Sequence, residues 1–396
     1  MSEALRASQF ARDPWPLVIG ATAAQVIGGL VTVTLPFVVG GLMAGIPLSE
    51  RDAGFVTSVE LLALALTAIA IVPLLARFSF RTVTVVAVAV TLLAQGASVF
   101  AVSLSSITVL RGIAGIGEGA LYAVSLSLIA ARAINPDKVY GYFQVAWALG
   151  GVPIFAFGGQ LTTAFAQRGI FALMEVATLV LAPLLLLIPG DRAGSGNEPT
   201  AKEARTSPVL GVLTLAAIGL YLVVSAGIYA FTTPLGERAG VGTDAVGYTL
   251  TVGTLIGVGG AAAATALNVR WGRMIPISGF FVAFTLDVLA LCFWRDSIVF
   301  IVALVAATVI FYFSVPYMFG LAAALDRSGR WAAAAGSAYL LGYAAGPAAG
   351  GIVIAGSGYA GLGVASVVVT AVAFSLSVIV CRRLDAAAPP VIAVGG

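Results

Sequence analysis

The chain has no histidine and only two cysteines among its 396 residues. Histidine is the commonest metal ligand and the usual acid or base near neutral pH, and structural metal sites also use clusters of cysteine or carboxylate. The sequence has no such cluster, no G-x-S-x-G nucleophile motif and no phosphate-binding P-loop. We therefore expect no enzyme activity, no metal or other cofactor, and no direct coupling to ATP.

Charge is also scarce, because 9% of the residues are charged whereas 60% are hydrophobic. A soluble protein of this size needs a far more charged surface, so the expected solvent is a lipid bilayer. The basic residues are dispersed and the net charge is +3, which predicts no nucleic-acid partner. Cys292 and Cys381 are too few for a disulfide framework.

Long apolar runs fill most of the chain, and a hydrocarbon core about 30 Å thick needs roughly 20 such residues per helix. Runs such as Val176–Ile188 lack the alternation typical of barrel strands, so the predicted fold class is an all-α integral membrane protein. Reading the charged interruptions as loops predicts twelve spans: 16–43, 53–75, 82–103, 106–131, 139–163, 169–189, 208–233, 245–268, 274–295, 297–323, 331–356 and 359–381.

The positions of lysine and arginine predict the orientation, since cytoplasmic loops retain positive charge. Arg111 lies within a span, and the side opposite the N-terminus holds Arg51, Arg168, Arg238 and Arg295. The other fifteen of the twenty basic residues share the side of the N-terminus. We expect a multi-pass protein of the cytoplasmic (inner) membrane with both termini cytoplasmic and an uncleaved first span.

A polar stretch at residues 190–207 divides the chain into two six-span halves, 1–189 and 208–381, followed by a tail at 382–396. It reads as a cytoplasmic linker. The halves resemble each other weakly. Short basic turns, LLARFSFR and LNVRWGR, follow the second span of each half, and glycine- and proline-rich fifth spans contain Pro153 and Pro347. Repeated halves are typical of transporters.

Six plus six spans, a long central loop and these turns resemble the major facilitator superfamily over nearly the whole chain. The resemblance implies two pseudo-symmetric six-helix bundles and alternating access. It also implies that the two short basic turns are gating loops, with the arginines Arg77, Arg81, Arg270 and Arg273. Ala76 and Val269 stand where relatives carry an acid. We expect a monomer with a small-molecule substrate.

Span four, ITVLRGIAGIGEGAL, is similar to that of bacterial permeases that exchange protons for drugs or sugars. Arg111, Gly115 and Gly117 match the pattern, whereas Ala114 replaces a glutamine and Glu118 replaces a small residue. The pattern that these permeases carry in span five is matched only loosely by span five of this chain. AGPAAGG at 345–351, in the second half, matches it better. The direction of transport therefore stays open.

Ionisable side chains inside spans cost several kcal/mol and invite functional hypotheses. Glu60 and Arg111 lie at similar depth, which predicts a charge pair that either couples protons or orients helices. Glu118, seven residues beyond Arg111, is the predicted main proton carrier, with a plain interhelical hydrogen bond as the alternative. Glu175 is expected to reach the membrane surface, and Asp287 to contact a neighbouring helix or take part in proton chemistry.

Polar and aromatic residues on the helices that the resemblance places around a central cavity are candidates for substrate binding. Ordinary packing or an interfacial aromatic belt is the alternative. The candidates are Arg111, Gln25, Tyr122, Gln144, Trp147, Tyr221, Tyr229, Tyr312, Tyr339 and Tyr343.

The function predicted from these features is secondary active transport, with proton-coupled export of a small organic molecule as the first choice. Proton-coupled uptake of an organic or aromatic acid, with Arg111 binding its carboxylate, is the alternative. Uniport and sodium coupling stay open, and a non-transporting receptor or assembly partner is the rival of another class.

Overall fold

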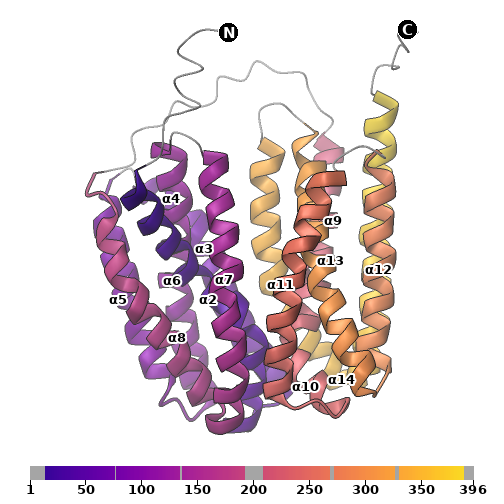
Figure 1. Ribbon diagram of the computed structural model, residues 1–396, viewed down its shortest axis with the longest axis horizontal. Coiled ribbons are helices and arrows are strands. Elements are labelled where there is room, and N and C mark those ends of the chain that lie inside the picture. The colour runs from indigo at the N-terminus through magenta and orange to yellow at the C-terminus, as the bar shows by residue number, and fades with distance from the viewer. Residues whose placement is uncertain are drawn as a thin grey trace.

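The computed structural model describes residues 14–75, 77–133, 136–191, 208–267, 272–325 and 330–387. These residues form helices that stand side by side in two groups, the first half of the chain in one and the second half in the other (Figure 1). We call the face where α2 begins and α14 ends the upper face, as it is drawn in Figure 1, and the opposite face the lower face.

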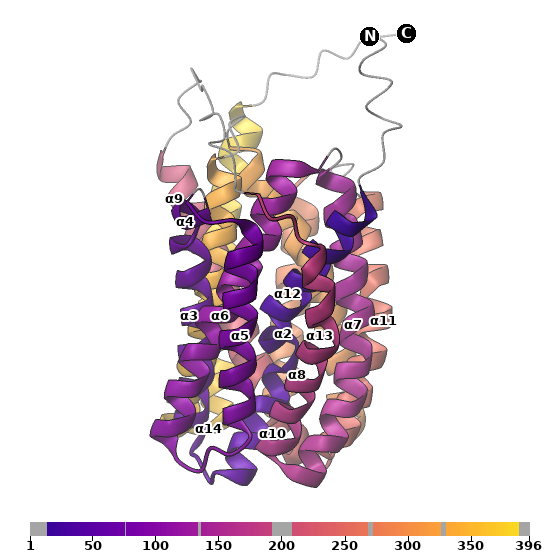
Figure 2. The same ribbon diagram turned by 90° about the vertical axis from the view of Figure 1, so that its left-hand side faces the viewer.

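The described residues of the first half form seven α-helices and a 3₁₀ turn that continues the last of them, and Figure 2 views this half directly. They are α2 (Trp15–Gly45), α3 (Glu50–Ala70), α4 (Val72–Leu75), α5 (Phe80–Ser98), α6 (Leu104–Arg132), α7 (Pro136–Phe165), α8 (Gln167–Leu181) and η1 (Ala182–Leu187). Helix α2 runs obliquely, from the upper face of this half to the lower centre of the molecule (Figure 1).

In the second half, the part of the chain that the structure describes forms six helices: α9 (Pro208–Ala230), α10 (Thr232–Arg238), α11 (Thr243–Leu267), α12 (Met274–Phe293), α13 (Ser297–Ala323) and α14 (Arg330–Ala387). Helix α14 is two helices joined at a kink at Gly358, whose φ of 68° lies in the left-handed region that favours glycine. This kink falls between the eleventh and twelfth predicted spans.

The twelve-span prediction is confirmed. Ten described helices are long and apolar enough to cross a membrane. One of the ten, α14, supplies two spans because of its kink, and α11, of 25 residues, adds the remaining one. The fold is therefore an all-α membrane protein.

Helix starts at the lower face follow from local capping. Ser103 and Ser106 form a capping box at the start of α6, and the Ser49 hydroxyl accepts a hydrogen bond from the Asp52 amide at the start of α3. Asp296 caps α13 by accepting from the amides of Ile298 and Val299. These polar caps fix where each span leaves the lower face.

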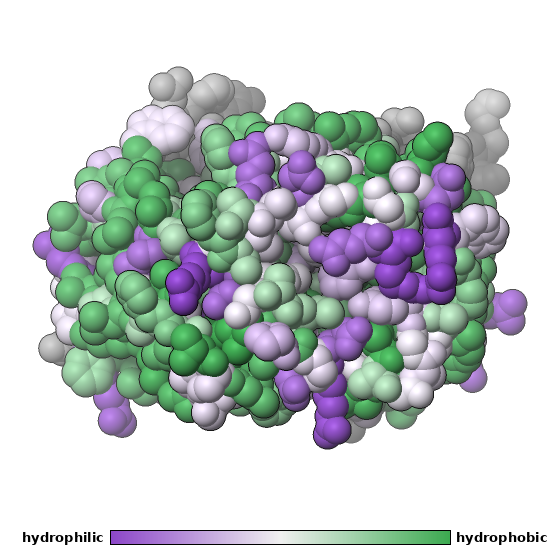
Figure 3. All heavy atoms as spheres, turned by 90° about the horizontal axis from the view of Figure 1, so that it is seen from below, coloured by the Kyte–Doolittle hydropathy of each residue, from purple (hydrophilic) through white to green (hydrophobic). Residues whose placement is uncertain are grey.

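Large apolar side chains point outward around the molecule, among them Leu93, Phe100, Ile298 and Val302. Seen from below, the rim is largely hydrophobic and most of the hydrophilic residues lie inside it (Figure 3). Such a surface is unsuited to water and suits lipid chains.

Candidate functional site

A cluster of charged side chains lies inside the first half, where α3 and α6 pack together. The Arg111 guanidinium donates through Nε to Glu60 Oε2 at 2.8 Å, and its Nη2 donates to Glu60 Oε1. Both side chains are completely buried. The predicted Glu60–Arg111 pair is therefore formed, and it is bidentate, which is the strong geometry for arginine and a carboxylate.

Glu118 joins this cluster from the next turns of α6. Its Oε1 lies 3.7 Å from Arg111 Nη2 and accepts a hydrogen bond of 3.1 Å from the Gln95 amide of α5. The Gln95 side-chain oxygen in turn accepts from the Thr178 hydroxyl of α8 at 3.1 Å. We call Glu60, Arg111, Glu118, Gln95 and Thr178 the charged cluster.

Two polar side-chain atoms of the charged cluster lack a hydrogen-bond partner among the described residues. They are Glu118 Oε2 and Arg111 Nη1, and both are buried. The guanidinium carbon of Arg111 instead lies 4.8 Å from the centre of the Phe171 ring, in a cation–π contact. A buried carboxyl oxygen without a donor is costly when ionised, whereas a protonated carboxyl is neutral.

Glycines place neighbouring helices directly against the Glu118 segment. A Cβ at Gly115, Gly117 or Gly119 would lie 2.2–2.3 Å from Glu60 O, Thr91 Oγ1 or Leu64 O respectively. A Cβ at Gly28 of α2 would lie 2.7 Å from the carbonyl oxygen of Glu118 itself. The space that these glycines leave is thus taken by other helices, and Glu118 is 0% exposed.

The halves meet near the lower face along two seams with matching glycines. In the first seam, between α3 and α14, a Cβ at Gly54 would lie 2.3 Å from Pro347 O, and one at Gly351 would lie 2.5 Å from Glu50 O. In the second, between α7 and α11, a Cβ at Gly247 would lie 2.4 Å from Phe155 O and one at Gly159 would lie 2.7 Å from Thr243 O. Gly54 and Gly247 each stand four residues after the start of their helix.

Polar contacts reinforce both seams. The Ser58 hydroxyl of α3 accepts a hydrogen bond of 2.8 Å from the amide of Ala348. The Gln160 amide of α7 donates to the Tyr248 hydroxyl of α11. The repeat seen in the sequence therefore corresponds to a pair of related helix contacts that hold the lower face together.

A family model described as the Major Facilitator Superfamily matches residues 17–327. The chain belongs to the major facilitator superfamily. It is therefore a multi-pass membrane transporter and not an enzyme. A comparison with curated protein sequences finds no match.

Solved structures of the same fold include a bacterial homologue of the human lysosomal transporter Spinster, in an inward-facing and unoccupied conformation. It is 16% identical, has a TM-score of 0.75, and the match covers 95% of this chain and 99% of that one. A D-xylose–proton symporter is 16% identical with a TM-score of 0.73, covering 91% and 97%. The nucleoside transporter NupG is 10% identical with a TM-score of 0.71, covering 93% and 99%.

The tyrosines predicted to bind substrate lie in different surroundings in this facilitator. Tyr221 is buried in the second half, where its hydroxyl shares a hydrogen bond of 2.6 Å with Ser314 and its ring meets three phenylalanines of α12. Tyr312 of α13 packs against Gly257 of α11. Tyr339 stacks on Tyr343 with ring centres 6.1 Å apart.

Tyr229 and Tyr343 instead reach across to the first half. The Tyr229 hydroxyl donates to Val33 O at 3.0 Å, and that of Tyr343 donates to Thr32 O at 3.3 Å. The backbone of α2 therefore already accepts hydrogen bonds from both hydroxyls in this structure.

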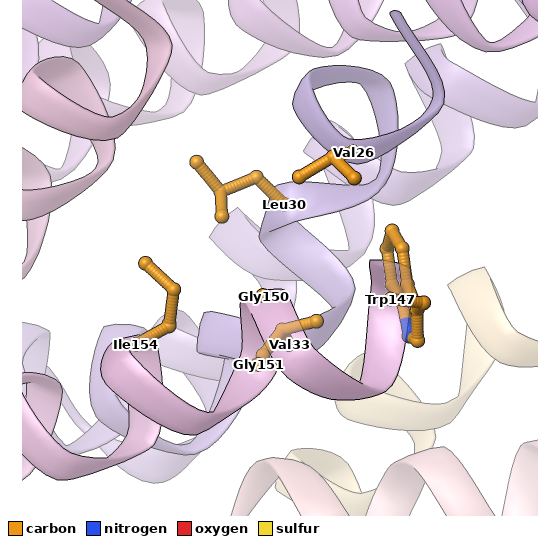
Figure 4. A pocket seen from close by; sticks show the side chains of 7 residues that line it. All are labelled: Val26, Leu30, Val33, Trp147, Gly150, Gly151 and Ile154. Atoms are coloured by element: carbon orange, nitrogen blue, oxygen red, sulfur yellow. The ribbon is translucent and has the colours of Figure 1, made fainter. Parts of the chain in front are cut away.

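The candidates of the first half lie on α2, α6 and α7. The amide oxygen of Gln25 accepts from the Ser125 hydroxyl, and Tyr122 is half-buried one turn earlier on α6. Trp147 packs against Gly29 and lines a pocket with Val26 and Gly150 (Figure 4). Its cavity volume of about 10 Å³ suits at most one water molecule, not an organic substrate. The side chain of Gln144 lies outside the described residues.

Of the predicted gating arginines, Arg81 is bound within its own half, donating to Ile188 O and Leu186 O at 3.1 and 3.2 Å. Arg77 is exposed and Arg273 is half-buried at the start of α12, while Arg270 lies outside the described residues. Arg81 thus binds the start of α5 to the end of the sixth span.

Glu175 and Asp287, the remaining charges within spans, lie outside the charged cluster. Glu175 is partly exposed on α8, and its Oε2 has no partner among the described residues. Asp287 is buried on α12, where its Oδ1 likewise lacks a partner in the described part of the chain. Gln95, Thr178 and Phe171 were missed as site residues, although a glutamine inside an apolar span was a usable signal.

The seams make a testable prediction about conformation. Gly54→Ala would place a Cβ 2.3 Å from Pro347 O, so the first seam must open. Overpacking of this kind costs about 1–3 kcal/mol, which shifts a two-state equilibrium roughly five- to hundredfold. Spin labels at exposed Val102 and Ile298, near the lower face of either half, should report a longer distance, and transport should fall.

Gly279→Ala is the matched control, because a Cβ there would meet nothing within 4 Å. The labelled protein would carry alanine at Cys292 and Cys381. An unchanged Val102–Ile298 distance in Gly54→Ala would show that the seam does not hold the lower face closed.

Proposed function

We propose that this transporter moves a small organic molecule by alternating access and couples the movement to protons, with export as its direction. Glu118 is the proton site, and Arg111 and Glu60 set its charge environment. The observation that supports this most strongly is the fully buried Glu118 carboxyl with one oxygen unpartnered beside a guanidinium that is already paired.

Charge balance supports a proton on Glu118. Two carboxyls and one guanidinium are buried without exposure, so ionising all three would leave one net negative charge inside the membrane, at a cost of several kcal/mol. Glu60 uses both oxygens on Arg111. The proton therefore belongs on Glu118, whose Oε2 is unpartnered.

Helix α2 connects the proton site to the interface between the halves. Its Gly28 touches the backbone of Glu118, and four to eight residues later Thr32, Val33 and Pro36 accept hydrogen bonds from the second half. A shift of α2 when the lower face opens would therefore disturb the packing around Glu118. Such a shared two-position element is what coupling requires.

The charge pattern of the loops supports an orientation with the upper face in the cytoplasm and the lower face outside the inner membrane. Together with this orientation, the closed seams at the lower face support an inward-facing state. The similar Spinster homologue is also described as inward-facing. The two halves move as six-helix units in this account, and no second copy of the chain is needed.

Export as the direction of transport is supported by the resemblance of span four to proton-exchanging permeases. Uptake of an organic acid bound by Arg111 is less well supported, because the guanidinium is buried and bound by Glu60. The similar D-xylose–proton symporter shares only the fold at 16% identity. The substrate site comprises the half-buried polar and aromatic residues between the halves, including Gln25, Tyr122 and Tyr339.

Purified protein in proteoliposomes tests coupling and direction. A thermal-shift screen of small organic molecules first finds a ligand. When that ligand is added outside vesicles that contain a pH dye, and moves inward in exchange for protons, the lumen should become more alkaline. Acidification of the lumen would show proton symport and overturn export, and no pH change during measured substrate flux would overturn proton coupling.

A further inference from the structure

The strongest unexplained feature is a set of three hydroxyls from the second half that all end on the backbone of α2. Tyr343 donates to Thr32 O at 3.3 Å, Tyr229 to Val33 O at 3.0 Å, and Thr233 of α10 to Pro36 O at 3.1 Å. Hydroxyls normally find partners nearby, so three donors from another part of the chain on adjacent turns of one helix require a cause.

Pro36 supplies the cause of the contact between Tyr343 and Thr32. In an α-helix the carbonyl of Thr32 would accept the amide proton of residue 36, but proline has none and its ring crowds the same carbonyl. The Thr32 oxygen is therefore left without its helical partner at a partly buried position within the membrane, where an unsatisfied backbone group costs several kcal/mol. Gly40 allows the close approach, since a Cβ there would lie 2.9 Å from Thr233 Cγ2.

We propose that Tyr343, Tyr229 and Thr233 form a latch that closes the lower side of the pathway. Tyr343 supplies the hydrogen bond that Pro36 has removed from the Thr32 carbonyl, and Tyr229 and Thr233 bind the neighbouring carbonyls of Val33 and Pro36. The latch is formed when the halves meet at the lower face and breaks when they part. These residues position the halves, and the proposal does not depend on the proton role of Glu118.

The latch and the seams have different tasks. The seams are close contacts of backbone through glycine, which set how near the halves come. The latch gives this closed arrangement hydrogen bonds that the open one lacks. When it opens, water or substrate must take over the Thr32 carbonyl and the tyrosine hydroxyls, which gives the open state a route for recognising a polar substrate.

The test is a double-mutant cycle between Tyr343 and Pro36, read by distances between spin labels in the full chain with alanine at Cys292 and Cys381. Labels at Val102 and Ile298 report the lower face, and labels at Phe78 and Ile275 report the upper face. Tyr343→Phe removes one hydroxyl and preserves the stacking ring. It should raise the ratio of lower-open to lower-closed protein roughly two- to tenfold, as the loss of one hydrogen bond implies, and shorten the upper distance.

Pro36→Ala restores an amide that can pair with the Thr32 carbonyl within α2. In that background Tyr343→Phe should change the ratio by less than about twofold, because the carbonyl no longer needs the tyrosine. Tyr221→Phe is the matched control, since its hydroxyl bonds Ser314 inside the second half, and it should leave both distances unchanged.

Two results would overturn the latch. In the first, Tyr343→Phe leaves the distance distributions of folded protein as they are in the original chain. In the second, its effect is equally large with Pro36→Ala, which would show that the proline does not create the acceptor. Tyr229→Phe gives a second, independent variant if Tyr343→Phe lowers the yield of folded protein, with the same expected direction.

Discussion

Glu60→Gln should lower the free energy of unfolding of this transporter by about 3–5 kcal/mol, because it leaves Arg111 as a buried cation without its bidentate partner. Glu118 stands 3.7 Å from the same guanidinium and would have to ionise to replace Glu60. The variant should therefore also lose proton-coupled transport. Denaturant or thermal unfolding in detergent measures the first effect.

Removing both charges should cost less than removing one. Glu60→Gln with Arg111→Gln leaves no buried charge in the pair, so we expect the double variant to recover much of the lost stability. Arg132→Gln is the control, since its ion pair with Asp191 is about half exposed at 45% and 43% and is worth less than about 1 kcal/mol. Equal stability of the single and double variants would contradict a stabilising pair.

Glu118→Gln should abolish proton-driven accumulation while keeping the protein folded and able to exchange substrate. Glutamine has nearly the same shape, can still accept from Gln95 and cannot carry a proton. One pH unit across the membrane equals about 1.4 kcal/mol per proton, enough for about tenfold accumulation at one proton per substrate. The variant should show no accumulation beyond equilibrium, whatever the pH gradient.

Asp287→Asn is the matched control for this prediction, because it also neutralises a buried carboxyl within a span, but in the other half. It should keep proton-driven accumulation. If Glu118→Gln accumulates substrate with an unchanged dependence on pH, Glu118 does no more than hold helices together, and coupling lies elsewhere.

The spans and the charge pair could be predicted from the sequence because each depends on one-dimensional information. Apolar runs between charged loops fix where helices cross, and the break between 356 and 359 coincides with the kink at Gly358. Glu60 and Arg111 could be matched because depth along a helix follows from counting residues.

The partners of Glu118 could not be predicted in this way. Which face of α5 and α8 turns toward α6 depends on how the helices pack. Gln95 and Thr178 are uncharged, so they were not among the ionisable residues selected within the spans. Likewise 47 glycines offer no basis for choosing Gly54 and Gly247 as the residues where the halves touch.

The role of Tyr229 and Tyr343 shows a further limit. Their positions on helices assigned to the cavity suggested substrate contact, yet their hydroxyls end on carbonyls of α2. The missing amide of Pro36 was visible in the sequence, but the donor that replaces it is Tyr343, 311 positions away from Thr32. The residue types were enough to select these tyrosines as candidates. Their contacts depend on how the two halves pack, which the sequence does not show.

The most direct test of the central claim is whether Glu118 holds a proton in this buried cluster, and infrared spectroscopy of the purified transporter measures it without a substrate. A protonated Glu118 should give the carbonyl band of a water-excluded carboxyl, which disappears in Glu118→Gln and persists in Asp287→Asn. A spectrum in which Glu118→Gln removes no such band would show that Glu118 is ionised beside Arg111, and would contradict its role as the proton carrier.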